Sequence, residues 1–571
     1  MPKGGTSDIV HTRMLDAVCQ YLSFRDLLLD LAFLASLVLA CIAPRFGERI
    51  CRAVERYAAI LARRKKLAII CVALLPVVLR LSFLPWAPVP VPHTHDEFSY
   101  LLAGDTFAHG RLTNPPHPMW VFLDTIHVNQ HPTYMSKYPP AQGFALGLGE
   151  ILGSPWIGVL ISVSGMSAAV LWMLQGWLPG SWALLGGILV VLRLGIFSYW
   201  MNSYWGGAVP AVGGALVLGA LPRLLRFWSS RDALILGIGA AVLATNRPME
   251  GLVLFLPVAV LLLVRCCGRG RPPLRVILSR LILPFSVVVL SCGIFIGYYN
   301  WRGTGSAFVF PYMVNEKTYV TTPTLFWEKP RPPLHYMNPQ FEAFYNEWMR
   351  SQWLEGRVNG VRQAIRHIGL SIVKVVYFFL WPELCVPFLA LPWMLRDRRT
   401  RFLTVLTAIS FLGFLLVPWT QAHYAAPLTA ALFALVVQAI RHLRQWQLLG
   451  RPVGIALSRV IVLFAALLAP FHPHTQAIGN PKPEGIEYRA VFERQLEKLP
   501  GKHLVIVRYS PEHPVLQEWV YNRADIDGEK IVWAREIPGV DLAPLLDYFR
   551  GRQVWIVEAD GSPPRLSSCS E

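Results

Sequence analysis

The chain has 571 residues, of which 54% are hydrophobic and 15% are charged, and its formal net charge is +18. A water-soluble protein of this length needs a larger share of charged residues, so the composition excludes an ordinary soluble enzyme and indicates a lipid bilayer as the main solvent. The positive charge does not indicate nucleic-acid binding, because the cations are spread over short segments between apolar runs.

Apolar runs of about 20 residues, enough to cross a hydrocarbon layer of roughly 30 Å, recur between residues 24 and 471. They predict an all-α polytopic membrane protein with about 11 to 12 transmembrane helices. The predicted spans are residues 24–43, 67–85, 155–176, 181–199, 206–223, 233–246, 251–265, 277–298, 372–395, 402–418, 424–440 and 453–471. The first of them has no cleavable signal peptide before it, and it is predicted either to cross the membrane or to lie along its surface.

Between these runs, basic loops alternate with loops that are nearly uncharged. Cations gather in every second loop, at residues 45–66, 223–231, 265–275, 396–401 and 441–451. The positive-inside rule places these loops in the cytoplasm. The two long segments 86–154 and 299–365, together with the tail from residue 472, are therefore predicted to face away from the cytoplasm.

Three domains follow from this topology. Residues 1–66 form an N-terminal segment with one membrane or interfacial helix and a basic cytoplasmic loop, and residues 67–471 form the transmembrane domain with both long outside loops. Residues 472–571 form a small extracytoplasmic α/β domain, because short apolar runs at 504–507, 531–533 and 554–557 predict strands and 542–549 predicts a helix. This tail carries no glycine-rich phosphate loop, and its role stays open.

The first outside segment begins with His-Thr-His-Asp-Glu-Phe-Ser-Tyr, residues 93–100. Adjacent Asp96 and Glu97 at a low-dielectric boundary repel each other, so one of them is expected to have a raised pKa, as a general base working near neutral pH requires. The alternative is structural: Asp96 caps an amphipathic helix that ends near Gly110.

Further along, Lys137 is one of only two cations in this segment. A cation outside the cytoplasm, against the general bias, suits an anionic group such as a lipid phosphate. A lysine that extends to the membrane surface is the alternative.

Two outside turns are unusually polar for their position between apolar spans. One carries Arg247 and Glu250, and the other carries His423 and Tyr424. Ionisable groups at such helix ends are candidates for a functional site, although Arg247 and Glu250 also suit a structural ion pair.

The turn at residues 199–206 holds aromatic and amide side chains, among them Asn202 and Tyr204, that suit either a sugar-binding site or an aromatic belt. The first outside segment also permits a zinc or manganese site, because it brings imidazoles and carboxylates into one loop. The spacing matches no metal motif, and the residues concerned are His93, His95, His127, His131, Asp96 and Glu97.

The pair Asp96–Glu97, the downstream Lys-Tyr-Pro-Pro at 137–140 and a many-helix body with an outside soluble tail together resemble a GT-C glycosyltransferase. The nearest resemblance is to the protein O-mannosyltransferase and aminoarabinose transferase group, which uses polyprenyl-phosphate sugars as donors. It covers residues 67–440 and lies more in layout than in residue identity. The chain departs from the pattern at Asn202 and Ser203, where relatives often carry an acidic residue, so the resemblance supplies no acidic residue there to position the acceptor.

The resemblance implies that Asp96 is the catalytic base, that Glu97 is its acidic neighbour and that Lys137 contacts the donor phosphate. A lipid phosphate leaves as a stable anion, so the reaction needs cations rather than an acid, and Arg247 or His423 is expected to assist Lys137. Transfer is expected to invert the anomeric centre, because no second carboxylate is evident on the opposite face. No metal ligand is assigned and a divalent ion stays open; the predicted substrate-binding residues are His95, Tyr100, Tyr138, Asn202, Tyr204, Glu250 and Tyr424.

The function predicted on these grounds is transfer of a sugar from a polyprenyl-phosphate donor to a hydroxyl of a glycan, lipid or protein acceptor. The expected partners are the bilayer and these substrates, and the expected location is a bacterial inner membrane with the site facing the periplasm. The alternative is a transporter or flippase of a lipid-linked or anionic substrate. The sequence shows no repeat between halves, and its polar residues cluster at the outer surface, which favours the enzyme. A non-catalytic assembly subunit is a third interpretation, under which Asp96 has no effect.

Overall fold

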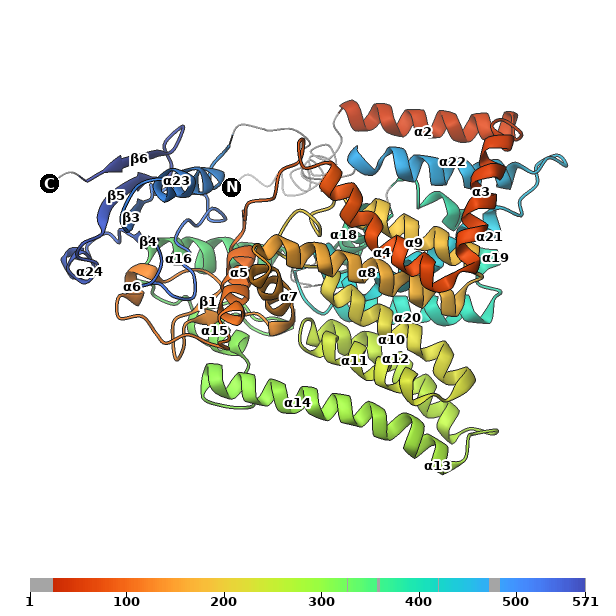
Figure 1. The fold of residues 1–571 in the computed structure, drawn as a ribbon, viewed down its shortest axis with the longest axis horizontal. Coiled ribbons are helices and arrows are strands. Elements are labelled where there is room, and N and C mark those ends of the chain that lie inside the picture. Colours follow the sequence, from red (N-terminus) through yellow and green to blue (C-terminus); the bar gives the residue numbers. More distant parts are fainter. Residues whose placement is uncertain are drawn as a thin grey trace, which may run out of the picture.

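The computed structural model describes residues 24–325, 327–356, 360–380, 382–419, 421–471 and 483–569. A helical bundle occupies most of the molecule, and a small domain with a β-sheet stands at one end of it (Figure 1). This confirms the predicted combination of a mostly helical body with a small C-terminal α/β region. Residues 1–23 and 472–482 of the predicted domains lie outside the described residues.

Each predicted apolar run contains a helix. The elements of the bundle and its connections are α2 (Phe24–Ile42), α3 (Glu48–Arg63), α4 (Lys65–Ser82), α8 (Pro155–Trp177), α9 (Gly180–Leu194), α10 (Ala208–Phe227), α11 (Ser230–Ala244), α12 (Pro248–Cys267), α13 (Leu274–Ile277), η1 (Leu278–Ile282), α14 (Leu283–Thr304), α18 (Val361–Phe379), η3 (Val386–Ala390), α19 (Leu391–Met394), α20 (Arg398–Phe414), η4 (Ala422–Leu428), α21 (Thr429–Leu443), α22 (Val453–Leu467) and η5 (Ala469–Phe471). Among the described residues, five helices or continuous helical segments are long and apolar enough to cross a membrane, and four apolar helices are shorter. Helix length therefore does not fix the number of spans.

The outer faces of the bundle are apolar. On α12, Leu252 is 67% exposed and Leu263 is 62% exposed, and on α14 Ile294 is 74% exposed. Side chains of this kind gain nothing from contact with water, and a continuous apolar face of this extent needs lipid around it. The chain is thus an integral membrane protein.

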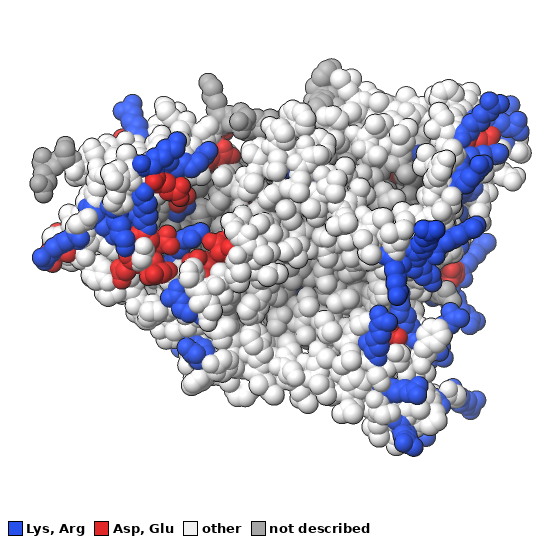
Figure 2. Space-filling model, viewed as in Figure 1, with Lys and Arg blue, Asp and Glu red and all other residues white. Residues whose placement is uncertain are grey.

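On the face shown in Figure 2, charged side chains gather at the two ends of the molecule, with a wide uncharged band between them. Lys and Arg dominate the end that carries α3 and α13, whereas acidic and basic residues mix at the end that carries the sheet domain (Figures 1 and 2). The basic loops of the positive-inside argument therefore share one end of the bundle, and the long outside segments occupy the other.

The N-terminal segment differs from the prediction in one respect. Residues 45–66 were expected to be a loop, but α3 occupies most of them. The segment alternates charged and apolar residues at helical spacing, and Arg52 pairs with Glu48 one turn away. Glu55 fixes the helix to the bundle through Arg444 and Arg459. The preceding helix α2 lies beside α22 in the bundle, with Phe33 against Phe464.

The predicted span 372–395 is wrong at both ends. Helix α18 begins at Val361 and ends at Phe379, and η3 and α19 follow it as short separate turns. Pro382 and Pro387 explain the break, because proline removes a helical hydrogen bond and clashes with the preceding turn.

The two long outside segments fold together at the end opposite the basic loops. The first contains α5 (His95–Ala108), α6 (Trp120–Leu123), the antiparallel pair β1 (Val128–Asn129) and β2 (Met135–Ser136), and α7 (Pro140–Ile151). The second contains α15 (Pro311–Tyr319), α16 (Pro339–Phe341), η2 (Glu342–Trp348) and α17 (Met349–Gly356).

Helices α5 and α7 cross in close contact because glycines line the crossing. A Cβ at Gly104 would lie 2.9 Å from the Leu146 Cβ, and one at Gly147 would lie 2.8 Å from the Gly104 carbonyl oxygen. Both distances are shorter than side chains tolerate, so only glycine allows this approach. The crossing joins the helix that carries Asp96 to the helix that follows Lys137.

The C-terminal domain packs directly on the first outside segment. It contains α23 (Glu487–Glu497), β3 (His503–Arg508), β4 (Ile531–Arg535), α24 (Ala543–Tyr548), β5 (Gln553–Glu558) and β6 (Arg565–Ser568). The strand order is β4-β3-β5-β6, with β3 parallel to both neighbours and β6 antiparallel to β5. The three predicted strands match β3, β4 and β5, whereas α23 and β6 were not predicted. Phe98 of α5 stacks on Tyr521 of the domain with ring centroids 4.2 Å apart.

Candidate active site

Asp96 lies in the first turn of α5 with its carboxylate free of the helix cap. The cap is Thr94, whose side chain forms a capping box with Glu97, so the structural alternative for Asp96, a helix cap, is wrong. The Asp96 carboxylate instead accepts a hydrogen bond from the Tyr138 hydroxyl, and its Oδ1 lies 4.0 Å from His127 Nε2. With 23% of its side chain exposed, Asp96 remains open to a substrate.

Glu97 is buried and fully engaged by the backbone around it. Its Oε1 accepts hydrogen bonds from the His93 and Thr94 amides at 3.1 and 3.3 Å, and its Oε2 accepts one from the Tyr204 amide at 3.0 Å. Burial raises the pKa of Glu97, and these backbone donors oppose the rise. Of the acidic pair, Glu97 therefore ties α5 to the loop at 195–207, and Asp96 is the one whose carboxylate stays partly exposed.

Lys137 directly follows β2 and adjoins the same tyrosine as Asp96. Its Nζ lies 5.2 Å from the centre of the Tyr138 ring, and its backbone amide donates to the His127 carbonyl at 3.3 Å. Burial lowers the pKa of Lys137 to about 8, while the charges of Asp96 and Glu316 oppose this shift. The structure thus brings the two principal sequence-predicted residues together around Tyr138.

A narrow cleft, with room for little more than a water molecule, opens beside Lys137. Its walls come from the start of α7, the end of α11, α14 and α15; the lining residues are Lys137, Pro139, Pro140, Ala244, Thr245, Ile296, Tyr299, Asn300, Phe310, Pro311 and Tyr312. Lys137 is the charged member of this otherwise uncharged lining. Because α14 carries the lipid-facing side chains described above, the cleft borders the membrane.

An aromatic and charged cluster surrounds Tyr138 on its other side. Tyr100 stacks on Tyr138 with centroids 4.4 Å apart, and Arg247 lies over the Tyr424 ring at 4.8 Å. Arg247 also pairs with Glu250 at 3.7 Å, as the structural alternative for these two residues predicted. Its charge interacts with both Tyr100 and Tyr138, so all five residues belong to one neighbourhood.

His423 extends this cluster. It is 5% exposed, its Nδ1 lies 3.2 Å from the Tyr199 hydroxyl, and its ring packs 4.9 Å from Trp205 and 5.0 Å from Tyr424. His423 is therefore linked to Arg247 through Tyr424. The described contacts do not join it directly to Lys137.

Asn202 and Tyr204 hold the 195–207 loop in place. The Asn202 side-chain oxygen accepts a hydrogen bond from Arg80 Nε at 2.8 Å, and its amide group donates to the carbonyls of Ile196 and Ser198. The Tyr204 hydroxyl donates to the Pro90 carbonyl at 2.9 Å. The hydrogen bonds described for these two residues thus go to the protein frame.

The histidines of the first outside segment are dispersed. His93 faces Glu487 at 3.7 Å, His131 is exposed and packs on Trp120, and only His95 and His127 lie together, with ring centroids 5.8 Å apart. Within the described residues, no group of three His, Cys, Asp or Glu side chains is placed to hold a metal ion. The metal hypothesis therefore gains no support from the geometry.

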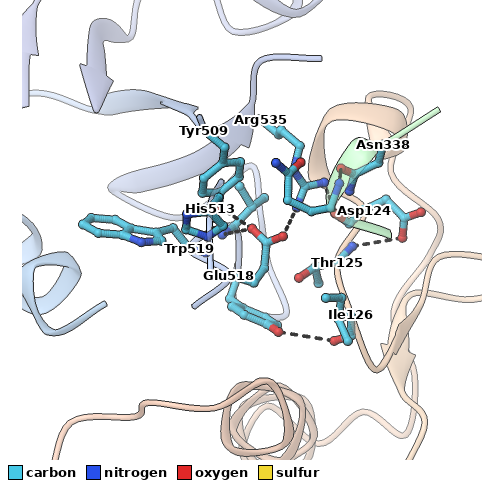
Figure 3. A network of polar contacts seen from close by, with 12 residues as sticks. Asp124, Thr125, Ile126, Asn338, Tyr509, His513, Glu518, Trp519 and Arg535 are labelled. Atoms are coloured by element: carbon cyan, nitrogen blue, oxygen red, sulfur yellow. Dashed lines mark hydrogen bonds and ion pairs between the residues drawn. The ribbon is translucent and has the colours of Figure 1, made fainter. Parts of the chain in front are cut away.

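Sequence reasoning missed the contacts that fix the segment 124–127. Glu518 and Arg535 of the C-terminal domain form an ion pair in which both side chains are at most 1% exposed, and Arg535 donates to the Asp124 carbonyl at 2.8 Å (Figure 3). The Tyr521 hydroxyl donates to the Ile126 carbonyl at 3.4 Å. The C-terminal domain thus holds the chain that leads directly into His127.

The second outside segment holds the same stretch from its other side. The Tyr319 hydroxyl donates to both carboxylate oxygens of Asp124, at 3.0 and 3.2 Å. Burial raises the pKa of Asp124 to about 7, although Tyr319 and Arg535 oppose the shift. No local sequence pattern marks these residues, because they meet only in the folded chain.

No family model matches the chain, and no match was found among curated proteins. Among solved structures, the chain is similar to an oligosaccharyltransferase from Archaeoglobus fulgidus in complex with Zn and sulfate, at 12% identity and a TM-score of 0.45, over 77% of this chain and 60% of that one. It is similar to the archaeal oligosaccharyltransferase AglB from the same organism with an inhibitory peptide and a dolichol-phosphate, at 11% identity and a TM-score of 0.45, over 86% and 69%.

A third structure, the Archaeoglobus fulgidus enzyme tethered to an acceptor peptide, gives 11% identity and a TM-score of 0.43 over 78% and 62%. The chain thus spans roughly three fifths to two thirds of the length of these proteins. Similarities at this level of identity and TM-score support no conclusion about function. The functional assignment therefore rests on the geometry around Tyr138.

Proposed function

We propose that this protein is a membrane glycosyltransferase of the GT-C type that moves a sugar from a polyprenyl-phosphate donor to an acceptor hydroxyl at the extracytoplasmic face. The observation that carries the proposal is the meeting of Asp96 and Lys137 around Tyr138, at the end of the bundle opposite the basic loops. A base and a cation on either side of one tyrosine, whose charges interact, suit transfer from a phosphate leaving group.

The donor phosphate is assigned to Lys137 and the lipid chain to the apolar outer face of α14 beside it. The exposed apolar side chains of α14 suit a polyprenyl chain that lies in the bilayer, and Lys137, the one cation in the lining of the adjoining cleft, suits its phosphate. With a pKa of about 8, Lys137 is mostly charged at pH 7, and a bound anion raises that pKa further. Arg247, which shares the Tyr100 and Tyr138 neighbourhood, adds positive charge on the far side.

The reaction is a single displacement. The acceptor hydroxyl gives its proton to Asp96 as its oxygen forms a bond to the anomeric carbon, and the bond from that carbon to the phosphate oxygen breaks. Polyprenyl phosphate leaves as an anion held by Lys137, so no acid is required. Glu97 is committed to backbone donors and does not serve as a second nucleophile, which predicts inversion.

The test uses the purified full chain in lipid nanodiscs with labelled polyprenyl-phosphate sugars and a panel of glycan, lipid and peptide hydroxyl acceptors. Release of polyprenyl phosphate is measured for wild type, Asp96→Asn and Lys137→Met. The matched controls are Asp541→Asn and Lys317→Met, both exposed residues outside the cluster. We expect loss of release in the first pair and wild-type release in the controls.

Two results would reject the proposal. One is release that is equal in Asp96→Asn and wild type. The other is an absence of release across the panel combined with movement of the labelled lipid between leaflets of vesicles, which would favour the transporter alternative.

A further inference from the structure

His127 has a backbone conformation that is uncommon outside glycine. Its φ angle is 67°, in the left-handed region that side chains other than glycine seldom adopt. Its carbonyl is held by two donors, the Ser99 hydroxyl at 2.7 Å and the Lys137 amide at 3.3 Å. A strained backbone that neighbouring groups hold in place often marks a functional position. The direction of the His127 side chain is therefore of interest.

The imidazole of His127 points to the candidate base. The residue is 7% exposed, with its ring edge-on to Tyr138, Phe344 and His95 at 5.6–5.9 Å between centroids. Its Nε2 lies 4.0 Å from Asp96 Oδ1. Its Nδ1 is buried and has no hydrogen-bond partner among the described residues.

The separation of 4.0 Å is too long for a direct hydrogen bond and suits one shared oxygen atom. An oxygen placed about 2.8 Å from both atoms subtends an angle of about 90° between them, which a hydroxyl group accommodates. A hydroxyl there donates its hydrogen to Asp96 and accepts one from His127 Nε2. Asp96 Oδ1 also accepts from Tyr138, and a carboxylate oxygen has room for both donors.

The His127 ring is suited to donate a hydrogen bond to the hydroxyl without taking the hydroxyl proton itself. Burial lowers the pKa of His127 well below the ordinary histidine value, and the positive charge of Lys137 acts in the same direction. The imidazole is therefore neutral at pH 7 and carries one hydrogen. That hydrogen belongs on Nε2, because the neighbouring group there is a carboxylate while Nδ1 has no described partner.

We propose that His127 is a further catalytic residue, which holds the acceptor hydroxyl against Asp96 by a hydrogen bond from Nε2 to the hydroxyl oxygen. This inference rests on the proposed glycosyl transfer and specifies where its acceptor binds. The hydroxyl proton passes to Asp96 Oδ1, one oxygen lone pair forms the new bond to the anomeric carbon, and the other stays on His127. The leaving phosphate departs on the Lys137 side, so donor and acceptor contacts are separate.

The separation of contacts gives a kinetic test on the full chain in nanodiscs, with a donor and an acceptor that pass the release assay. The variants are His127→Asn, which tolerates the left-handed backbone but is too short, and His127→Gln, whose amide nitrogen reaches the position of Nε2. The control is His131→Asn in the same loop, exposed and outside the cluster. KM for donor, KM for acceptor and kcat are measured for each.

We expect His127→Asn to lower kcat/KM for the acceptor by about 10²-fold, with the donor KM unchanged, because removing one positioned catalytic group has effects of this size. His127→Gln should recover part of the loss, and His131→Asn should match wild type. Unchanged donor KM also shows that the variant is folded.

Other results overturn the inference. If His127→Asn matches His131→Asn in a working enzyme, His127 has no catalytic role. If it raises donor and acceptor KM together, or if His127→Gln is no better than His127→Asn, the residue is only structural. If wild type consumes no donor, the proposed function fails first and the acceptor role falls with it.

Discussion

Replacing Arg535 by methionine tests how the C-terminal domain is held on the outside loops. The Arg535 and Glu518 side chains are at most 1% exposed, and without Arg535 the Glu518 carboxylate keeps, among the described residues, Tyr509 and the Val520 amide as partners. Leaving one buried charge of a pair uncompensated costs about 3–5 kcal/mol. Losing the hydrogen bond to the Asp124 carbonyl adds about 1 kcal/mol.

The paired change of Arg535 to methionine and Glu518 to leucine separates these contributions. It removes both charges, and buried pairs replaced by apolar residues of similar volume are often neutral or more stable. The double variant should therefore lose only about 1–2 kcal/mol, from the Asp124 and Tyr509 hydrogen bonds. By the same figures a double-mutant cycle should give a coupling of about 6–10 kcal/mol, because each single variant leaves one buried charge uncompensated and the double variant leaves none.

The assay is limited proteolysis of the C-terminal domain in nanodiscs across a urea series, which reports its local unfolding. Arg550→Met, at an exposed ion pair with Asp547, is the matched control and should change stability by less than about 1 kcal/mol. A loss below about 1 kcal/mol for Arg535→Met, or a double variant less stable than the single one, would refute the reasoning about the buried charge.

Three further outcomes are expected. Asp124 has a pKa raised to about 7 in the fold, so its protonated form stabilises the docked domain at low pH; domain stability should fall between about pH 4 and pH 7, and Asp124→Asn should flatten this slope in proteolysis at each pH. A leucine at Gly147 meets the Gly104 carbonyl, so Gly147→Leu should lower the melting temperature by several degrees, whereas Gly293→Ala in open space on α14 should not. Lys137 has a pKa of about 8, so donor KM should rise above pH 8 in wild type, and Lys137→Arg should keep it constant to higher pH.

The helical body was predictable because a bilayer requires long apolar segments, and these are visible in one dimension. The predicted helix boundaries were wrong where features other than apolar run length decide the structure. Pro382 and Pro387 break the run at 372–395, and the charged segment 45–66 hides an amphipathic helix.

The site was predictable only in part. Asp96 stands out because it is paired with Glu97, and Lys137 stands out because cations are scarce in the first outside segment. The fold brings both residues to the same tyrosine. His127 carries no such signal, since its backbone angle and its distance to Asp96 exist only in three dimensions. Arg535 contacts a carbonyl 411 residues away, which no local pattern could indicate.

The first turn of α5 explains how both the apolar bundle and the polar C-terminal domain help to position the Asp96 carboxylate. Successive residues of a helix point about 100° apart, so Glu97, Phe98 and Ser99 face three different neighbours. Glu97 binds the Tyr204 amide of the bundle loop, Phe98 stacks on the C-terminal domain, and Ser99 binds the His127 carbonyl. These three contacts fix the helical turn that carries Asp96, and none of them covers its carboxylate. A change in the C-terminal domain should therefore alter the reaction at Asp96 although the domain itself touches neither Asp96 nor Lys137 in the described contacts.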